Sequence, residues 1–456
     1  MKISILNKWD VGGGAARAAY RLYKNLKESN NEIKYLVNQK ALNFDPQIVQ
    51  FDFENVNFCY LDGLLQKNLI DNNRTELSST YFSNTFNFID FKNKEEIKWA
   101  DVINLHWVEK YVSQFGLLSL MQANKPIIWT LHDQRPLTGG CHYASGCDGF
   151  VNNYCKQCAQ LKFDNTNLPF HSLTSKKDIL QGGNVTIVTP SKWLADEARR
   201  SLIFKDNDIQ VIPNSVETNI FKVINKKIAK RKLGINENSF CLMFGCHDLT
   251  ERRKGFQLLK EAISILLNFE KFNGKVQKHE VVISIVGANK DLDLDLPIKT
   301  INFGGINDDE VLATIYSAAD VFVLPSLEDN LPNTMLESMA CGTPVIGFDI
   351  GGIPDVVIPD ENGWLAEECS SVSLAMCILD ALLNPEKTSA FSLSSSRLIN
   401  SKFNAVNQRD AYLSLYAEKL SINGSFIYNN YLDKIKIFEN YSSSIGYAKI
   451  KEFNLI

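Results

Sequence analysis

Two acidic residues, Asp329 and Glu337, are separated by seven residues in a polar stretch that follows a short apolar run. The run Val-Phe-Val-Leu is bounded by Pro325 and predicts a buried parallel strand. The polar stretch is rich in turn residues, and Asn333 and Thr334 are residue types that cap helices. A strand, an acidic loop and a helix N-terminus in this order predict an anion site with a carboxylate beside it.

Carboxylates at such a place can hold a sugar or a ribose, because one carboxylate accepts two hydrogen bonds from vicinal hydroxyls. Asp329 and Glu337 are therefore candidates to face one sugar nucleotide, with its diphosphate on the helix end. Considered alone, the two acids would be explained as helix-capping residues.

Three consecutive cations, Arg252, Arg253 and Lys254, precede Gly255 and the start of a predicted helix. Cations at a helix N-terminus oppose the helix dipole and are disfavoured there unless an anion lies between them. A phosphate ligand would resolve that conflict. The alternative is an exposed basic turn without a ligand.

Two histidines follow predicted strands. His132-Asp133 comes directly after the strand 127–131, and His106 comes after the strand 102–105. Doubly wound sheets place ligand contacts at the carboxyl ends of their strands. A single histidine there is more often structural, but two at carboxyl ends favour a site.

Three glycines, Gly12, Gly13 and Gly14, follow the first predicted strand and precede a strongly helix-forming segment. Glycines at such a turn let the backbone approach a ligand closely. Their spacing differs from the dinucleotide fingerprint, so it does not favour NAD. A tight turn without a ligand is the alternative.

Four thiols lie in the glycine-rich loop 139–158, at Cys141, Cys147, Cys155 and Cys158. The two-residue gap between Cys155 and Cys158 lets both thiolates reach one ion, so the loop predicts a structural zinc site with these four ligands. Four thiolates would close the coordination shell, which argues against a catalytic zinc. The alternatives are small buried hydrophobic residues and, third, a disulfide.

The rest of the chain indicates the elements that position these residues. With 456 residues, the chain is too long for one ordinary core, and its 45% hydrophobic and 22% charged residues are typical of soluble globular proteins. The net charge of −4 gives no electrostatic case for a nucleic-acid partner. Strands that alternate with helices predict α/β domains with parallel sheets. The predicted strands are 2–6, 32–37, 102–105, 127–131, 185–188, 209–212, 240–244, 281–286, 300–303, 321–324 and 345–348.

These elements predict two domains joined by a linker. The N-terminal domain is expected over 1–213, with an irregular insertion at about 41–91, and the linker over 214–235. The basic run in the linker favours a solvated helix over contact with an anionic membrane. The second domain is expected over 236–403, an amphipathic helix over 404–420 and a tail of unknown role over 421–456.

Together these motifs resemble the retaining glycosyltransferases of family 4, which have the GT-B fold. The resemblance covers roughly residues 1–420, and its most specific element is the stretch from Pro325 to Val345, which is similar to the Glu-x7-Glu signature of the family. The Cys-rich loop and the sequence 330–334 resemble a bacterial subgroup associated with capsule, exopolysaccharide and lipopolysaccharide synthesis. The supporting motifs are Gly12-Gly13-Gly14, His132-Asp133, the sequence 211–216, Lys254-Gly255 and the sequence 351–355.

The resemblance implies a fold and a reaction. The fold would be two doubly wound Rossmann-like domains that face each other across a cleft, with the C-terminal helix returning to the N-terminal domain. The reaction would be transfer of a sugar from a nucleoside-diphosphate sugar, with retention of anomeric configuration, to a saccharide or lipid-linked acceptor. Catalysis would need no metal or other cofactor.

The resemblance also implies roles for individual residues. Glu337 would bind the ribose hydroxyls, and Asp329 stands where a Glu of the family contacts the donor sugar. Lys254 would neutralise the diphosphate, and His132 would lie near the reacting face of the sugar. The amides of the stretch Asn330, Leu331, Pro332, Asn333 and Thr334 would contact sugar and phosphate. Gly12, Gly13 and Gly14 would close over the phosphates and help to shape the acceptor entrance.

The chain departs from the family pattern at two positions. Asp329 is one methylene shorter than the usual Glu, which would alter the sugar hydroxyl that it reaches. The arginine that the family carries five residues before the lysine is replaced by Leu249. Arg253 or Arg252 are the candidates to take its place.

Two other classes of function remain open on the sequence. A sugar-nucleotide epimerase of the same fold would need protein acid and base groups that act on the sugar ring. A non-catalytic sugar-nucleotide-binding subunit of a polysaccharide-synthesis complex is the other. The N-terminal apolar stretch is too short for a signal-peptide core, so the expected location is the cytoplasm, peripheral at the inner face of the cytoplasmic membrane if the acceptor is lipid-linked.

Overall fold

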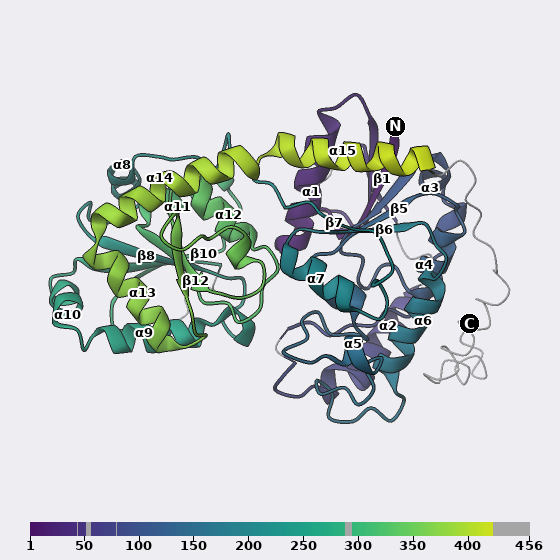
Figure 1. Ribbon diagram of the computed structural model, residues 1–456, viewed down its shortest axis with the longest axis horizontal. Coiled ribbons are helices and arrows are strands. Elements are labelled where there is room, and N and C mark those ends of the chain that lie inside the picture. Colours follow the sequence, from purple (N-terminus) through teal and green to yellow (C-terminus); the bar gives the residue numbers. More distant parts are fainter. Residues whose placement is uncertain (43, 52–55, 79, 288–293, 423–456) are drawn as a thin grey trace. The chain divides into compact units, whose positions relative to one another are not determined.

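The computed structural model describes residues 1–42, 44–51, 56–78, 80–287 and 294–422, and the chain divides into two compact units (Figure 1). Unit 1 contains residues 1–212 and the chain from residue 409 onward, and unit 2 contains residues 213–408. The predicted tail lies outside the described residues except for its first two, which end a helix.

Unit 1 is built on a parallel sheet with the strand order β3-β2-β1-β4-β5-β6-β7. The short central strands β4 and β5 are buried at every residue, as expected of parallel strands covered on both faces. The strands are β1 (Lys2–Trp9), β2 (Glu32–Gln39), β3 (Ile48–Gln50), β4 (Val102–Leu105), β5 (Ile127–Thr130), β6 (Val185–Thr189) and β7 (Ile209–Val211). The helices are α1 (Gly13–Lys27), α2 (Val56–Leu69), α3 (Glu95–Trp99), α4 (Gln114–Met121), α5 (Gly149–Asn152), α6 (Leu168–Leu180) and α7 (Lys192–Arg200).

The C-terminal helix α15 (Ala405–Ile422) packs on unit 1, as predicted. Tyr412, Leu415 and Tyr416 are buried in the same apolar cluster as Ile3 and Ile128 of the sheet. The tyrosines are one helical turn apart, so both rings lie on the face that is buried.

Unit 2 is built on a second parallel sheet, with the order β10-β9-β8-β11-β12-β13. Two apolar clusters flank this sheet, one around α12 and one around α9 and α13. The strands are β8 (Phe240–Gly245), β9 (Val281–Val286), β10 (Lys299–Gly304), β11 (Val321–Leu324), β12 (Val345–Phe348) and β13 (Gly363–Ala366). The helices are α8 (Lys226–Lys232), α9 (Phe256–Leu266), α10 (Glu270–Gln277), α11 (Asp309–Ala318), α12 (Asn333–Ala340), α13 (Ser371–Leu383) and α14 (Pro385–Lys402).

The sequence predicted most of these strands but missed β3 and β13. The stretch 41–91, expected to be irregular, contains β3 and α2. The basic run expected as a solvated linker forms α8, which is part of unit 2: Lys226 and Lys230 both pair with Asp320 at 2.9 and 2.8 Å. Lys230 is buried, so this part of the run packs within unit 2 and is not a solvated linker.

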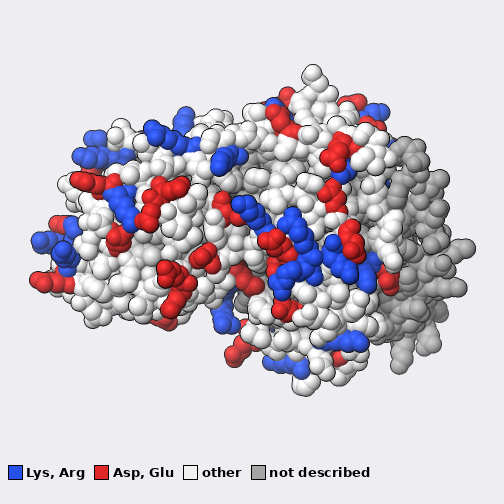
Figure 2. All heavy atoms as spheres, in the orientation of Figure 1, with Lys and Arg blue, Asp and Glu red and all other residues white. Residues whose placement is uncertain are grey.

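The surface carries both signs of charge. On the face drawn in Figure 2, Lys and Arg side chains are interspersed with Asp and Glu side chains, in keeping with the balanced composition. Among the described residues, no helix is both long enough and apolar enough to cross a membrane.

Candidate functional site

Asp329 is the centre of a cluster of charged side chains in unit 2. Its carboxylate accepts hydrogen bonds from Lys254 Nζ at 2.7 Å and from Ser326 Oγ at 3.1 Å, and Arg253 lies 3.3 Å away. Arg253 is held in turn by Glu251 and by the carbonyl oxygen of Glu328. The structure thus brings together three of the residues that the sequence singled out, from two loops 75 residues apart in the chain.

The Asp329 carboxyl is buried, and burial alone would raise its pKa. The cations Lys254 and Arg253, with the hydrogen bonds from Lys254 and Ser326, instead hold the pKa of Asp329 at about 2. The group is therefore a carboxylate at neutral pH.

Two glycines allow the loops to meet at this point. Gly255 has φ 69°, and a Cβ there would come within 1.8 Å of the carbonyl oxygen of Pro325. Gly351 has φ 56°, and a Cβ there would lie 1.9 Å from the carbonyl oxygen of Asp329. That oxygen accepts a hydrogen bond from the backbone of Gly352. Gly255 and Gly351 are therefore explained by close backbone packing against Pro325 and Asp329.

Helix α12 begins directly after this cluster, preceded by Pro332 and without a side-chain cap. Its first turn contains no acidic residue, so the N-terminal N–H groups meet no carboxylate within that turn. Asn330 and Leu331 are buried, whereas Asn333 and Thr334 are half-buried. The arrangement suits an anion at the helix end.

Glu337 lies one turn into α12 and is buried, with 2% of its surface exposed. The hydroxyl of Tyr316 in α11 donates a hydrogen bond to its carboxylate at 3.2 Å. A contact between Glu337 and a ribose therefore requires a ligand that reaches into this buried position, and it stays a prediction.

The protein itself supplies anions for the cations at the start of α9. Asp329 and Glu251 pair with Arg253, and Asp329 also pairs with Lys254, so the conflict with the helix dipole needs no ligand to resolve it. Arg252 is exposed, which makes Arg253 the arginine that accompanies Lys254. The side chain of Lys254 is 23% exposed and can still meet an added anion.

In unit 1, the glycine turn lies where β1 ends and α1 begins. Gly12 and Gly13 have φ of 107° and 74°, and Gly12 to Gly14 are exposed at the start of a helix that has no side-chain cap. The buried carboxylate of Asp10 accepts hydrogen bonds from the backbone N–H groups of residues 11, 41 and 42. Asp10 thereby fixes the backbone that leads into the turn.

His132 and His106 meet at the carboxyl ends of β5 and β4. His106 Nδ1 lies 2.9 Å from His132 Nε2, and the rings stack with centroids 5.2 Å apart. Burial lowers the pKa of His132 to about 4 and that of His106 well below its usual value. Both imidazoles are neutral at pH 7, and His132 and the glycine turn lie at the same edge of the sheet.

Asp133 has hydrogen-bond partners that differ from those of His132. Its carboxylate bonds to His142 Nδ1 at 2.7 Å and accepts a hydrogen bond from Trp107 Nε1 at 2.9 Å. His142 Nε2 lies 2.8 Å from Ser83 Oγ, which also bonds to Glu109 at 2.9 Å. These three groups resemble a Ser-His-Asp arrangement, but Ser83 is buried and already has two side-chain partners, so it cannot receive a substrate.

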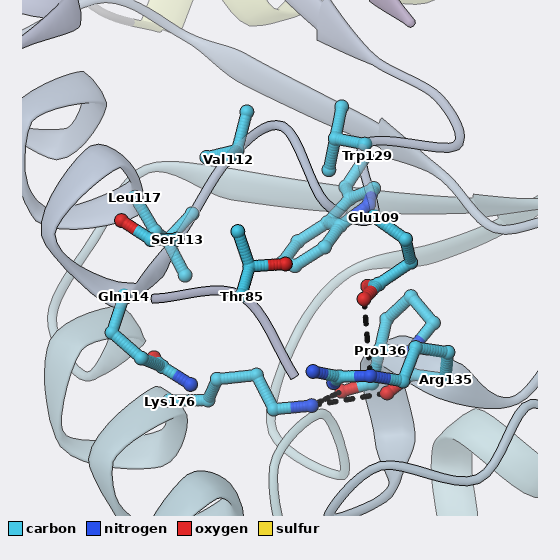
Figure 3. A pocket seen from close by; sticks show the side chains of 11 residues that line it. Thr85, Glu109, Val112, Ser113, Gln114, Leu117, Trp129, Arg135, Pro136 and Lys176 are labelled. Carbon is cyan, nitrogen blue, oxygen red and sulfur yellow. Dashed lines mark hydrogen bonds and ion pairs between the residues drawn. The ribbon is translucent and has the colours of Figure 1, made fainter. Parts of the chain in front are cut away.

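A small cavity lies beside this network, between the loops that follow β4 and β5 and the helices α4 and α6 (Figure 3). Its volume of about 20 Å³ suits one water molecule and excludes a sugar ring. Glu109 pairs with Arg135 at 3.2 Å, and the ammonium of Lys176 donates to three backbone carbonyls. These charges therefore hold the loops together.

The structure does not support the predicted zinc site. Among the described residues, no three His, Cys, Asp or Glu side chains form a group that could hold a metal ion. Cys155 packs in the main apolar core of unit 1, whereas Cys141 and Cys158 pack in another cluster with Phe82. Burial raises the pKa of Cys155 to about 11 and that of Cys158 to about 12. The four thiols are free, so the alternative of small buried hydrophobic residues describes Cys141 and Cys155, whereas Cys158 is only partly buried.

Several residues of the site were missed by the sequence analysis. Ser326 and Tyr316 contact predicted groups, and Asp10 holds the backbone that leads into the glycine turn, but polar residues next to a motif are too common to single out. Asn104 offered a clearer signal, because an amide within a buried strand needs partners there.

Comparisons with known proteins show what the chain is similar to. Residues 241–384, within unit 2, match the family model described as Glycosyl transferases group 1. A D-inositol 3-phosphate glycosyltransferase of Geodermatophilus obscurus is 30% identical over 211 residues, which are 43% of this chain and 46% of that protein. An N-acetyl-alpha-D-glucosaminyl L-malate synthase of Bacillus anthracis is 25% identical over 215 residues, 46% of this chain and 52% of that protein. The chain thus spans about half the length of these curated relatives.

Solved structures resemble the whole described fold. Sucrose-phosphate synthase from Thermosynechococcus elongatus aligns with a TM-score of 0.62 and 18% identity, over 92% of this chain and 99% of its own. The Anabaena protein HepE, solved in complex with UDP-glucose, aligns with a TM-score of 0.59 and 17% identity, over 92% of this chain and 100% of its own. These structures confirm the predicted fold, with two Rossmann-like α/β units of the GT-B class.

Proposed function

We propose that this protein transfers a sugar from a nucleoside-diphosphate sugar to a hydroxyl of a saccharide or lipid-linked acceptor. The observation that carries the proposal is the cluster of Asp329, Lys254 and Arg253 before the uncapped start of α12. It lies within the segment that matches the group 1 glycosyltransferase model. The HepE structure with UDP-glucose adds support, because a protein of the same fold binds such a donor.

Each part of the cluster has a task in donor binding. Lys254 and the N-terminus of α12 would neutralise the diphosphate, and Arg253 would add positive charge beside it. Asp329 would accept hydrogen bonds from hydroxyls of the donor sugar, and Glu337 would accept them from the ribose. The backbone of Asn330 to Thr334 would contact sugar and phosphate.

The reaction follows from what these groups can stabilise. The acceptor oxygen forms a bond to the anomeric carbon while the bond from that carbon to the phosphate oxygen breaks. The nucleoside diphosphate leaves with the electron pair and takes up the acceptor proton. Charge develops on the leaving phosphate, where Lys254, Arg253 and the helix end would act, so we expect no required metal ion. Retention of configuration is what the sequence resemblance to the retaining glycosyltransferases of family 4 implies.

On the acceptor side, we assign His132 and the turn of Gly12, Gly13 and Gly14, which lie at one edge of the unit 1 sheet. A neutral imidazole beside the reacting sugar can exchange hydrogen bonds with a hydroxyl without adding charge. The sequence resemblance favours a role in bacterial surface polysaccharide synthesis. An acceptor of that kind, if lipid-linked, would bring the protein to the inner face of the cytoplasmic membrane.

A donor screen tests the proposal. Nucleoside diphosphate release and the shift of the unfolding temperature would be measured with a panel of UDP-, GDP-, ADP- and dTDP-sugars, each with and without acceptors. We expect one donor to protect the protein and to be consumed, with turnover undiminished in EDTA. NMR should show that the transferred sugar has the same anomeric configuration in the product as in the donor.

Other outcomes would point to the rival functions. An epimerised sugar nucleotide without glycosylated product would indicate an epimerase. Thermal protection without transfer or slow hydrolysis, across the whole panel, would indicate a binding subunit. Either result would overturn the proposed transfer.

A further inference from the structure

A chain of buried hydrogen bonds connects helix α15 to His132 within unit 1. The hydroxyl of Tyr416 donates to Asn104 Oδ1 at 2.8 Å, and His106 Nε2 lies 3.1 Å from the same oxygen. His106 Nδ1 then lies 2.9 Å from His132 Nε2. Asn104 is fully buried and His106 is 3% exposed, so the chain is shielded from solvent.

The orientation of the Asn104 amide is fixed by the backbone. Its Nδ2 group donates to the carbonyl oxygen of Ile128 at 2.9 Å and lies 3.3 Å from that of Leu105. A carbonyl oxygen can only accept, so a flipped amide would place two acceptors face to face. Oδ1 must therefore point to Tyr416 and His106, and both must donate to it.

The tautomers of the two histidines follow from this orientation. His106 must carry its proton on Nε2 to donate to Asn104. Burial and the neighbouring His132 lower the pKa of His106 well below its usual value, so the ring is neutral and its Nδ1 is an acceptor. His132 must then carry its proton on Nε2 to donate to His106.

We propose that Asn104, held by Tyr416 of the C-terminal helix, is a positioning residue that sets the tautomer of His132, so that His132 uses Nδ1 as its acceptor nitrogen. In the proposed glycosyl transfer, on which the role of this nitrogen rests, a hydroxyl of the sugar or acceptor is its partner. The helix that closes unit 1 therefore takes part in preparing the site. It does so through hydrogen bonds in addition to apolar packing.

Tyr412 provides an internal comparison on the same helix. Its ring is also buried, with its centroid 5.8 Å from that of Tyr416, but its hydroxyl bonds to Thr130 Oγ1 at 3.0 Å. Thr130 receives a hydrogen bond from the Nδ2 side of Asn104, away from the histidines. Loss of the Tyr412 hydroxyl thus leaves the acceptor oxygen of Asn104 in place.

The tautomers can be read directly in the full-length protein. Long-range proton–nitrogen NMR correlation distinguishes the two neutral forms of imidazole, and the six histidines can be assigned by single substitutions. At pH 7 we expect His106 and His132 both in the Nε2–H form. A protonated Nδ1 on either ring would overturn the proposal, and this measurement needs no activity.

Two variants test the positioning role. Asn104→Leu removes the fixed acceptor, so we expect a mixture of tautomers at His132 and a loss of about tenfold in kcat, with KM for the donor within about twofold. Tyr412→Phe is the control, with unchanged tautomers and kcat within about twofold. Tyr416→Phe should have a kcat between those of Asn104→Leu and Tyr412→Phe. Its thermal stability should match that of Tyr412→Phe.

The outcomes separate this inference from the proposed function. Wild-type tautomers in Asn104→Leu, or a kcat no lower than that of Tyr412→Phe, would overturn the role of Asn104. If Asn104→Leu does not fold, the wild-type spectrum and Tyr416→Phe decide. Failure of every donor in the screen would refute glycosyl transfer and would leave the tautomer result standing.

Discussion

Replacing Asp329 by Asn should separate nucleotide affinity from turnover. The Asp329 carboxylate pairs with Lys254 at 2.7 Å and with Arg253 at 3.3 Å. A nucleoside diphosphate that binds Lys254 must share this cation with Asp329. Removing the negative charge removes that competition, whereas the contact with the donor sugar is lost.

The expected size of the effect follows from the pKa of Asp329. Its pKa is about 2, compared with 3.8 for the free group, which corresponds to about 2 kcal/mol of net stabilisation of the carboxylate. If the carboxylate loses about half of this stabilisation when a diphosphate binds, Asp329→Asn should bind nucleoside diphosphate about fivefold more tightly than wild type. We expect kcat to fall at least about tenfold, because the sugar loses its charged acceptor.

Calorimetric titration with the nucleoside diphosphate, with steady-state kinetics, provides the assay. Asp320→Asn is the matched control, since Asp320 pairs with two lysines of α8 in the same unit and its pKa is also lowered from 3.8 although burial alone would raise it. The control should lose stability but keep its nucleotide affinity. Weaker or unchanged diphosphate binding in Asp329→Asn would refute the idea that Asp329 competes for Lys254.

Further predictions follow from single contacts. Gly255→Ala, with φ 69° and a Cβ 1.8 Å from a carbonyl oxygen, should lower the free energy of unfolding by about 2 kcal/mol or more in chemical denaturation, whereas Gly274→Ala in α10 meets no atom within 4 Å and should not destabilise. Tyr316→Phe should weaken donor binding about threefold and Glu337→Ala more strongly, and equal affinities in all three proteins would remove Glu337 from the site. Because burial lowers the pKa of His132 from 6.5 to about 4, the unfolded chain takes up this proton first as the pH falls. Wild type should therefore lose stability relative to His132→Gln between pH 6.5 and 4, by at most about 3 kcal/mol, and parallel stability curves would contradict this. Zinc analysis of the purified protein should give a stoichiometry near zero, with a thermal midpoint that EDTA does not change.

The sequence by itself determined the α/β class and most of the strands of both sheets. Runs such as 321–324 and 345–348 are short, apolar and bounded by turn residues, a pattern that parallel strands share regardless of their neighbours. The chemistry of the loop 325–342 and the three cations before Gly255 were also visible, because residue types and spacing are local properties. The strands β3 and β13 were missed, since Ile-Val-Gln and Gly-Trp-Leu-Ala are too short and mixed to form an apolar run of their own.

Only the tertiary structure decided which of these residues have partners. Asp329 and Lys254 meet across 75 residues of chain, and their pairing replaces the ligand that the isolated cations had seemed to need. The cysteine spacing allowed a metal site, but within the described part of the chain no three His, Cys, Asp or Glu side chains are grouped so that they could hold an ion. Asn104 and Tyr416 are separated by 312 residues, so no local pattern could connect them to the protonation of a histidine. Long-range hydrogen bonds and burial depend on the folded chain, and they set the charge of Asp329 and, in the proposed hydrogen-bond chain, the tautomer of His132.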